Sequence, residues 1–275
     1  MSESVDAVSL TPEVDIARLG NLFDLTGKTA FVPGGYGAIG AAICWGLALH
    51  GARVAVAGPN EDRSYALAKA IRTAGHEAVS YCLDARQVPE IRETVDHVVE
   101  AFGGIDILVN CVGIQREENL LEVTEETFDE MYETNLKSAM FLGQAVAKHQ
   151  IARGAGGRHL HLLSVRSQLA LRGRGYSAYC STKGGLLMLL KQHAMELAPH
   201  GITVNGVAPT FIQSDRIRPH LDRPEFRDFI LERNPLGRIG DPVEVAGPII
   251  SLVSDAGSYM TGQIVYVDGG VTASQ

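Results

Sequence analysis

Short apolar runs alternate with longer segments of helical spacing from Leu25 to the end of the chain. Runs that are apolar throughout are typical of strands buried on both faces, and the segments between them have the period of helices. The predicted strands cover residues 28–33, 53–58, 77–83, 105–110, 158–164, 202–207 and 263–269. This alternation predicts an α/β fold in one domain, a doubly wound parallel sheet of about seven strands with helices on both faces.

Six helices are predicted between these strands, over residues 39–50, 61–74, 88–102, 124–152, 178–198 and 242–254. Residues 210–237 interrupt the alternation, because Asp, Arg and Pro are mixed there with aromatic residues. A long insertion of this kind is often a lid over a substrate site. We therefore expect an N-terminal extension over residues 1–21, one domain over 22–275, and a substrate lid at about 210–237.

Composition limits the possible partners and compartments. A net charge of −8 argues against a nucleic acid or an anionic membrane surface as partner. No segment approaches the run of about 18 apolar residues that a membrane helix needs, and residues 1–20 lack the basic start and apolar core of a signal peptide. Cys44, Cys82, Cys111 and Cys180 are scattered, which indicates reduced thiols in a cytoplasmic protein rather than disulfides or a zinc site.

A glycine-rich turn, PGGYGAIG at residues 33–40, follows the first predicted strand and leads directly into a helix. Glycines allow the backbone to approach a pyrophosphate, and the N-terminus of the following helix favours negative charge. Gly35, Gly37 and Gly40 fit the pattern G-x-G-x-x-G, and Gly34 is an additional glycine. The turn therefore predicts a dinucleotide-binding site.

Three side chains suited to one carbonyl oxygen follow in the middle of the chain. Tyr179 and Lys183 are four residues apart in a predicted helix, so they share one face. An ammonium beside a phenol favours the phenolate, and a drop of about three pKa units would correspond to about 4 kcal/mol. Ser164 ends a predicted strand, where α/β folds bind ligands. Because Tyr-x-x-x-Lys is also an ordinary surface pair, its weight depends on the other motifs.

Taken in order, these motifs resemble those of the short-chain dehydrogenase/reductase family, and the likeness covers about residues 22–273. The family pattern T-G-x-x-x-G-[IL]-G corresponds here to PGGYGAIG, and N-N-A-G corresponds to NCVG. The helix asparagine of the family is Asn135 and its serine is Ser164. Y-x-x-x-K corresponds to YCSTK, and P-G falls in the segment NGVAPT. The resemblance implies a Rossmann-type fold and an NAD(P)-dependent oxidoreductase. It would interconvert a secondary alcohol and a ketone by hydride transfer.

The resemblance also implies the role of each site residue. Tyr179 would be the general acid and base, and Ser164 would hydrogen-bond the substrate oxygen, with Ser167 as a less favoured substitute. Lys183 would lower the pKa of the tyrosine and hold the nicotinamide ribose, and Asn135 would position a water relay. The cofactor-binding residues implied are Gly34, Gly35, Tyr36, Ala38, Ile39, Gly40, Asn60, Asp84, Ala85, Asn110, Val112, Gly113, Tyr179, Lys183, Pro209 and Ile212.

Some positions depart from the family pattern. Pro33 replaces the usual threonine, Ala38 replaces the middle glycine, and Thr210 replaces the glycine of P-G. The interval from Ser164 to Tyr179 is also about two residues longer than usual. These changes put the affinity for the cofactor in question and leave open a non-catalytic NAD(P)-binding homologue.

The sequence leaves the choice between NAD and NADP open. Gly58 and Pro59 occupy the positions of the acidic residue and the arginine that usually decide it. Asn60 suits either cofactor, and Arg63 would either reach a phosphate or be a solvated helix charge. Because no cation is clearly placed, the sequence favours NAD slightly.

The substrate is expected to be a small carbonyl or alcohol compound. Arg116, Arg166, Arg172 and Arg174 lie on loops near the predicted pocket and would suit an anion such as a sugar acid, although solvated loop arginines are the ordinary alternative. The general layout resembles gluconate-type and polyol dehydrogenases, and a 3-oxoacyl thioester reductase shares most of the motifs. Epimerisation or dehydration is disfavoured, because relatives of that type usually carry a longer C-terminal domain.

Two further expectations concern assembly and metals. The apolar helix LLMLLKQHAMELA resembles the family helix that forms a four-helix dimer interface, which implies a homotetramer. His159 and His161 share one face of a predicted strand. No third residue lies at a spacing typical of metal ligands, so no metal site is expected.

Overall fold

The computed structural model describes residues 14–215 and 217–273. Seven parallel strands form one sheet in the order β3-β2-β1-β4-β5-β6-β7. They are β1 (Thr29–Pro33), β2 (Arg53–Gly58), β3 (Ala78–Cys82), β4 (Ile107–Asn110), β5 (Gly157–Leu162), β6 (Ile202–Pro209) and β7 (Ile264–Val267). The predicted fold class is confirmed. The order reverses between β1 and β4, which is the place where open parallel sheets bind ligands.

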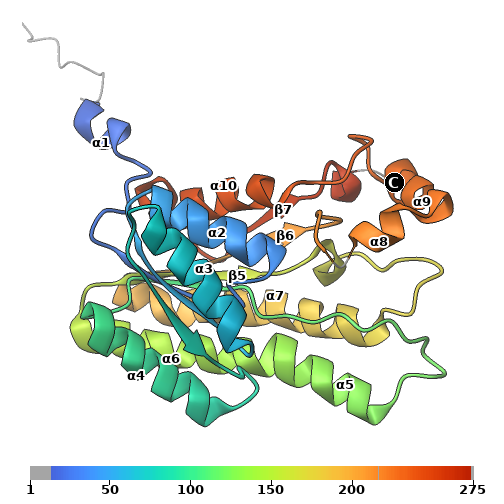
Figure 1. The fold of residues 1–275 in the computed structure, drawn as a ribbon, viewed down its shortest axis with the longest axis horizontal. Coiled ribbons are helices and arrows are strands. Elements are labelled where there is room, and N and C mark those ends of the chain that lie inside the picture. Colours follow the sequence, from blue (N-terminus) through green and yellow to red (C-terminus); the bar gives the residue numbers. More distant parts are fainter. Residues whose placement is uncertain (1–13, 216, 274–275) are drawn as a thin grey trace, which may run out of the picture.

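Helices cover both faces of the sheet (Figure 1). They are α1 (Ile16–Gly20), α2 (Ala38–Leu49), α3 (Glu61–Thr73), α4 (Val88–Phe102), α5 (Glu125–Tyr132), α6 (Ser138–Arg153), α7 (Ser177–Leu197), α8 (Arg218–Leu221), α9 (Pro224–Arg233) and α10 (Pro242–Val253). Figure 1 shows α2, α3 and α10 in one layer, and α4, α6 and α7 in the other.

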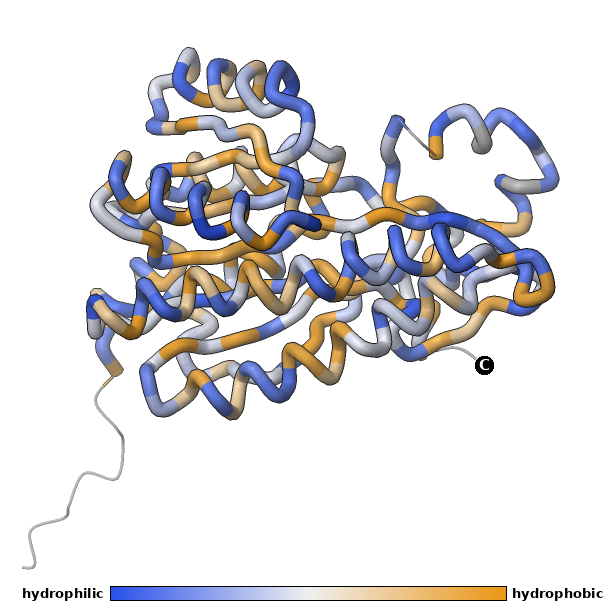
Figure 2. Tube along the Cα trace, turned by 90° about the horizontal axis from the view of Figure 1, so that it is seen from below, coloured by the Kyte–Doolittle hydropathy of each residue, from blue (hydrophilic) through white to orange (hydrophobic). Residues whose placement is uncertain are grey.

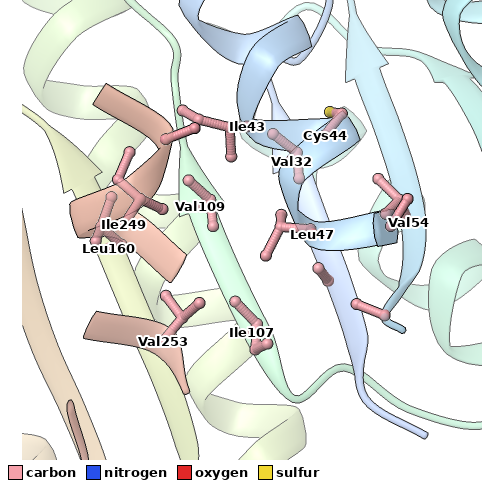
Figure 3. Close-up of a cluster of buried hydrophobic side chains, with 14 of the residues drawn as sticks. Val32, Ile43, Cys44, Leu47, Val54, Ile107, Val109, Leu160, Ile249 and Val253 are labelled. Carbon is pink, nitrogen blue, oxygen red and sulfur yellow. The ribbon is translucent and has the colours of Figure 1, made fainter. Parts of the chain in front are cut away.

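The core is built on both faces of the sheet, because successive strand residues point to opposite sides. On one face, Val32 packs in a cluster with Leu47 of α2 and Ile249 of α10 (Figure 3). On the other face, Phe31 packs with Leu142 of α6. All five residues of β1 are buried, which explains why the predicted strands are apolar throughout. Figure 2 shows hydrophobic and hydrophilic residues alternating along the helices, as expected where one side of a helix faces the sheet.

The helix predicted over residues 124–152 is interrupted. A π-helical turn, Glu133–Lys137, joins α5 to α6. The turn contains Asn135, which is fully buried. Because a π-helical turn continues the helical path, the apolar spacing that predicted one helix does not reveal it.

The segment predicted as a lid contains two helices. It leaves β6 at Pro209, forms an isolated bridge between Ile212 and Gly240, and includes α8 and α9. Most of the predicted N-terminal extension lies outside the described residues, and its last part forms α1 with Ile16 and Leu19 exposed. The division into extension, domain and lid stays a prediction. None of the helices within residues 14–215 and 217–273 is long and apolar enough to cross a membrane.

Three buried histidines meet between β5 and α7. His159 and His161 lie on the same face of β5, and the ring of His161 lies 6.4 Å from that of His193 of α7. Each ring has one nitrogen bonded to a neighbour, such as Gln150 Oε1 for His159 Nε2 at 2.9 Å. The other nitrogen of each ring has no partner among the described residues. Even with His193 as a third histidine, the described residues contain no group with metal-binding geometry.

These histidines are expected to make stability depend on pH. Burial lowers the pKa of His159 to about 3 and also lowers the pKa values of His161 and His193. In the unfolded chain each pKa returns to about 6.5, so below that pH only the unfolded state takes up these protons. Stability is therefore lost as pH falls from about 6.5 towards the folded values, by about 1.4 kcal/mol per pH unit and histidine.

Urea denaturation between pH 7 and pH 5 measures this loss. The variant His159→Gln, which retains an amide to bond Gln150, is expected to lose stability less steeply with falling pH than the wild-type chain. Equal slopes for the two proteins would contradict the assignment of a neutral, buried His159.

Candidate active site

The glycine-rich turn is shaped by contacts that exclude side chains. Gly34 has a φ of 76°, and a Cβ there would lie 2.7 Å from the backbone of Cys111. A Cβ on Gly40 would lie 2.5 Å from the carbonyl oxygen of Gly34. A Cβ on Gly35 would likewise lie 2.8 Å from the carbonyl oxygen of Val32. By contrast, a Cβ on Gly37 would meet nothing closer than 3.6 Å. The structure therefore requires glycine at the first three positions and not at Gly37, although Gly37 completes the sequence pattern.

The turn also leaves the start of α2 open to an anion. Gly37 is the N-cap residue of α2, and no side chain caps its first turn. The backbone N–H groups at such a helix end lack intrahelical partners and favour a phosphate. Gly34, Ala38 and Gly40 line the cleft described below, so the turn is directly available to a ligand.

Ser164 is held at the start of a short turn beyond β5. Its Oγ accepts a hydrogen bond of 3.2 Å from the backbone N–H of Arg166, and its side chain is buried. This contact leaves the hydroxyl proton of Ser164 able to donate to a substrate oxygen. Ser167 donates its own hydroxyl to the carbonyl of Ser164 at 2.7 Å and does not line the cleft. The geometry thus favours Ser164 over Ser167.

Lys183 and Tyr179 lie on the same side of α7. Lys183 Nζ donates to the carbonyl of Leu162, the last residue of β5, at 2.9 Å, and lies 6.0 Å from the centre of the Tyr179 ring. The lysine is only 4% exposed, and burial lowers its pKa to about 8. Its charge is therefore retained at neutral pH beside the tyrosine. A Cβ on Gly113 would come within 3.4 Å of Nζ, so the loop after β4 passes close to the lysine.

Asn135 ties that loop to α7. Its Oδ1 accepts from the backbone N–H of Ile114 at 2.8 Å, and its Nδ2 donates to the carbonyl of Ile114 at 3.0 Å. Nδ2 also contacts Thr182 Oγ1 at 3.1 Å. The side chain of Asn135 does not line the cleft. It therefore positions the loop beside Lys183, and its role in a water relay stays a prediction.

These segments enclose one cleft of about 1100 Å³ at the carboxyl ends of the strands. It adjoins the reversal of strand order between β1 and β4. The predicted residues that line it are Gly34, Ala38, Ile39, Gly40, Val112, Gly113, Ser164, Tyr179, Lys183, Pro209 and Ile212. The structure thus brings the glycine turn and three of the four predicted catalytic side chains to the same space.

An arginine that lines the cleft stacks on a tyrosine beyond β2. The Tyr36 ring covers Gly58, where any side chain would run into it. The guanidinium carbon of Arg63 lies 4.7 Å from the centre of that ring, and Arg63 lines the cleft. This stacked pair stands where Rossmann-type folds distinguish the two nicotinamide cofactors.

Comparison with known proteins agrees with this geometry. The family model described as "Enoyl-(Acyl carrier protein) reductase" matches residues 35–272. The gluconate 5-dehydrogenase of Gluconobacter oxydans is 35% identical over 254 residues, which are 92% of this chain and 98% of that protein. The chain belongs to the short-chain dehydrogenase/reductase family. It is an NAD(P)-dependent oxidoreductase that acts on CH–OH groups.

Two other members illustrate the range of the family. The 3-oxoacyl-[acyl-carrier-protein] reductase of Staphylococcus epidermidis is 36% identical over 246 residues, 89% of this chain and 98% of that one. A gluconate 5-dehydrogenase from Burkholderia cenocepacia, solved in complex with NADP and tartrate, is 34% identical with a TM-score of 0.88. That comparison covers 93% of this chain and 99% of the solved one.

Some predicted cofactor residues of this short-chain dehydrogenase do not line the cleft, namely Gly35, Tyr36, Asn60, Asp84, Ala85 and Asn110. Asn60 caps α3 by accepting the backbone N–H of Arg63 at 2.9 Å. The Asp84 carboxylate forms an ion pair of 2.7 Å with Arg86, which lowers the pKa of Asp84. Asn110 accepts the backbone N–H of Val112 at 3.0 Å. Their contacts with a cofactor therefore stay predictions.

The cleft also contains residues that the sequence did not single out as ligands, among them Cys111, Ile114, Gln115, Glu117, Tyr176, Phe211, Ser214, Asp215 and Ile217. Most follow a recognised motif or lie in the predicted lid, so proximity to a motif was the available signal. Of the four loop arginines, Arg166 and Arg174 line the cleft. Arg116 instead pairs with Glu130 at 2.9 Å, and Arg172 does not line the cleft.

The glycine contacts predict unequal effects of adding one methyl group. Gly34→Ala would combine a left-handed φ with a backbone clash and is expected to lower the free energy of unfolding by about 2–4 kcal/mol. Gly37→Ala, which has a φ of −67°, should cost less than about 1 kcal/mol. Urea denaturation without cofactor measures both, and equal losses would contradict this account of the turn.

Proposed function

We propose that the chain interconverts a secondary alcohol and a ketone on a polyhydroxy carboxylate, with Tyr179 as the general acid and base. The observation that carries this proposal is the meeting of Ser164, Tyr179 and Lys183 with the glycine turn in one cleft. The residues fit a dinucleotide, because Gly34 and Gly40 leave bare backbone beside an uncapped helix N-terminus.

Each side chain has a defined task in this proposal. In oxidation, Tyr179 takes the hydroxyl proton as the carbonyl forms, and in reduction it returns that proton to the oxygen. Ser164 donates a hydrogen bond to the same oxygen, and the charge of Lys183 favours the ionised phenol. When bound, the nicotinamide accepts the hydride in oxidation and supplies it in reduction.

For the cofactor, the position of Arg63 favours NADP. The sequence favours NAD slightly only because it shows no cation at the position that would bind the 2′-phosphate of NADP. Arg63 now lines the cleft on top of Tyr36, and Gly58 offers no carboxylate to ribose hydroxyls. A guanidinium suits a phosphate, and the related gluconate 5-dehydrogenase from Burkholderia cenocepacia was solved with NADP. We therefore assign Arg63 to the 2′-phosphate of NADP.

The substrate class is supported by relatives and by charge. The gluconate 5-dehydrogenases among the relatives act on a sugar acid by name, and the cleft contains Arg166 and Arg174. A second candidate is reduction of a 3-oxoacyl thioester, favoured by the similarity to the Staphylococcus epidermidis reductase. A non-catalytic binding protein is disfavoured, because Ser164, Tyr179 and Lys183 are all in the cleft.

Assembly as a homotetramer belongs to the same proposal. The helices α6 and α7 expose apolar side chains, including Met188 and Met195 at 60% each. A second subunit would cover them, as the resemblance to the family implies. The cytoplasmic location stays a prediction.

Removal of the Tyr179 hydroxyl is expected to stop turnover without loss of cofactor. Tyr179→Phe should lower kcat by about 10³-fold, because a general acid typically contributes 10²–10⁴-fold. The dissociation constant of NADPH should change by less than about threefold, because the ring is retained. Nicotinamide absorbance and fluorescence measure the two quantities during a screen of sugar acids, polyols and 3-oxoacyl thioesters.

The control is Tyr176→Phe, because Tyr176 lines the same cleft and its ring lies 6.2 Å from that of Tyr179. This variant is expected to retain most of the turnover. Full turnover by Tyr179→Phe would contradict the proposal, and turnover restricted to thioesters would favour the second candidate.

Loss of the Arg63 charge is expected to weaken the binding of NADPH and to leave the binding of NADH unchanged. Arg63→Gln should raise the dissociation constant of NADPH by about 10–100-fold, since a charged hydrogen bond contributes about 1.5–3 kcal/mol. Fluorescence titration with each nucleotide measures this. Arg72→Gln is the matched control, because Arg72 lies on the same helix and stacks on Tyr65 but does not line the cleft. Equal weakening of NADH would contradict the assignment.

A further inference from the structure

The cleft carries a local charge opposite to that of the chain. Its described charged residues are four cations and two carboxylates, namely Arg63, Arg166, Arg174, Lys183, Glu117 and Asp215. The whole chain has a net charge of −8. A concave site of this sign within an acidic protein favours anionic ligands over neutral ones.

Arg166 is the most enclosed of the cleft arginines. It follows Ser164 by two residues, in the short turn after β5, and is 8% exposed. Its Nη1 donates to the carbonyl oxygens of Leu169 and Ala170 at 3.2 and 3.0 Å. These bonds hold the guanidinium in one place and stabilise the loop that leads to α7.

The charge of Arg166 is not balanced within the described part of the protein. No ion pair joins it to a carboxylate there, whereas Arg174 is paired with Glu117. Its Nε and Nη2 atoms make no hydrogen bond with residues 14–215 or 217–273, and neither atom is sealed from solvent. Burying a charge without a counter-ion is costly, and an arriving anion would offset that cost.

The guanidinium also lies close to the reacting groups. Arg166 lines the same cleft as Tyr176 and Tyr179, and burial lowers its pKa. The backbone N–H of the same residue is bonded to Ser164 Oγ at 3.2 Å. An anion on the Arg166 side chain would therefore be held at a fixed place relative to the hydroxyl that contacts the substrate oxygen.

We propose that Arg166 binds the carboxylate of the substrate through Nε and Nη2, and so makes the enzyme select polyhydroxy acids over the corresponding neutral polyols. This inference rests on the proposed function, which supplies the reaction on the secondary alcohol. The Nε and Nη2 atoms form the edge of a guanidinium that accepts a carboxylate in two parallel hydrogen bonds. Arg174 is not the primary receptor, because Glu117 already neutralises it.

The test compares D-gluconate with D-glucitol, which differ only at the terminal carbon. For Arg166→Gln, we expect the KM for gluconate to rise by about 10–100-fold, as for the loss of charged hydrogen bonds. Any effect of the altered loop should be the same for both substrates, so the ratio of kcat/KM for gluconate to kcat/KM for glucitol should fall by about 10–100-fold. Arg166→Lys should recover part of the gluconate affinity, because it keeps a cation. Arg172→Gln, on the same loop but outside the cleft, should leave kcat and KM unchanged for both substrates.

A binding measurement separates this inference from the proposed function. Gluconate should raise the Tm of the complex with oxidised cofactor for the wild type and not for Arg166→Gln, whether or not turnover follows. Gluconate binding through Arg166 without any oxidation would support the inference and contradict the proposed function. Oxidation of both substrates with equal KM values would contradict the inference and support the proposed reaction on a secondary alcohol.

Two further outcomes would overturn the inference. One is an equal loss of activity towards both substrates in Arg166→Gln, together with a lower Tm of the free protein, because that would show a residue that only stabilises its loop. The other is a gluconate affinity that Arg166→Gln leaves unchanged. Both would leave the Tyr179 test of the proposed function unaffected.

Discussion

The site depends on a buried ammonium at the end of a strand. Lys183 is almost fully enclosed, and the carbonyl at the end of β5 holds it at 2.9 Å. Its pKa falls to about 8, so the protein bears the cost of keeping a charge in a poorly solvated place. Such a cost is typical of functional sites. The hydrogen bond also links α7 to the sheet, and thereby places Tyr179, one turn earlier on α7, beside the strand ends.

The surrounding structure keeps that space available. A glycine after β4, Gly113, lets the backbone pass close to the ammonium, and the buried side chain of Asn135 binds both backbone groups of Ile114. A π-helical turn supplies that asparagine between α5 and α6. On the opposite side, Gly34 and Gly40 pack backbone against backbone, which leaves the N-terminus of α2 facing the same cleft. Four segments that are distant in sequence therefore meet at the reversal of strand order.

The sequence predicts the strands and the Tyr179–Lys183 pair well, because each of these patterns has a single physical explanation. Buried parallel strands must be apolar on both faces, so their runs are visible, and the four-residue spacing of Tyr179 and Lys183 fixes their shared face. Local contacts set by the tertiary fold are not visible. Gly37 matches the motif but has no steric need for glycine, and the helical period hides the π turn at Asn135. Likewise, the sequence does not show that Arg116 forms an ion pair and that Arg166 bonds backbone carbonyls instead, because these contacts depend on how the loops fold.

Isotopic labelling follows the transferred hydride directly. The purified enzyme is mixed with the keto acid of the proposed reaction and with reduced cofactor that carries deuterium at both positions of the nicotinamide C4, and the product is analysed by mass spectrometry and NMR. We expect one deuterium on the new carbinol carbon with the wild type, and formation of the labelled product about 10³-fold more slowly with Tyr179→Phe. Product formed without deuterium at that carbon, or labelled product formed equally fast by Tyr179→Phe, would contradict this mechanism.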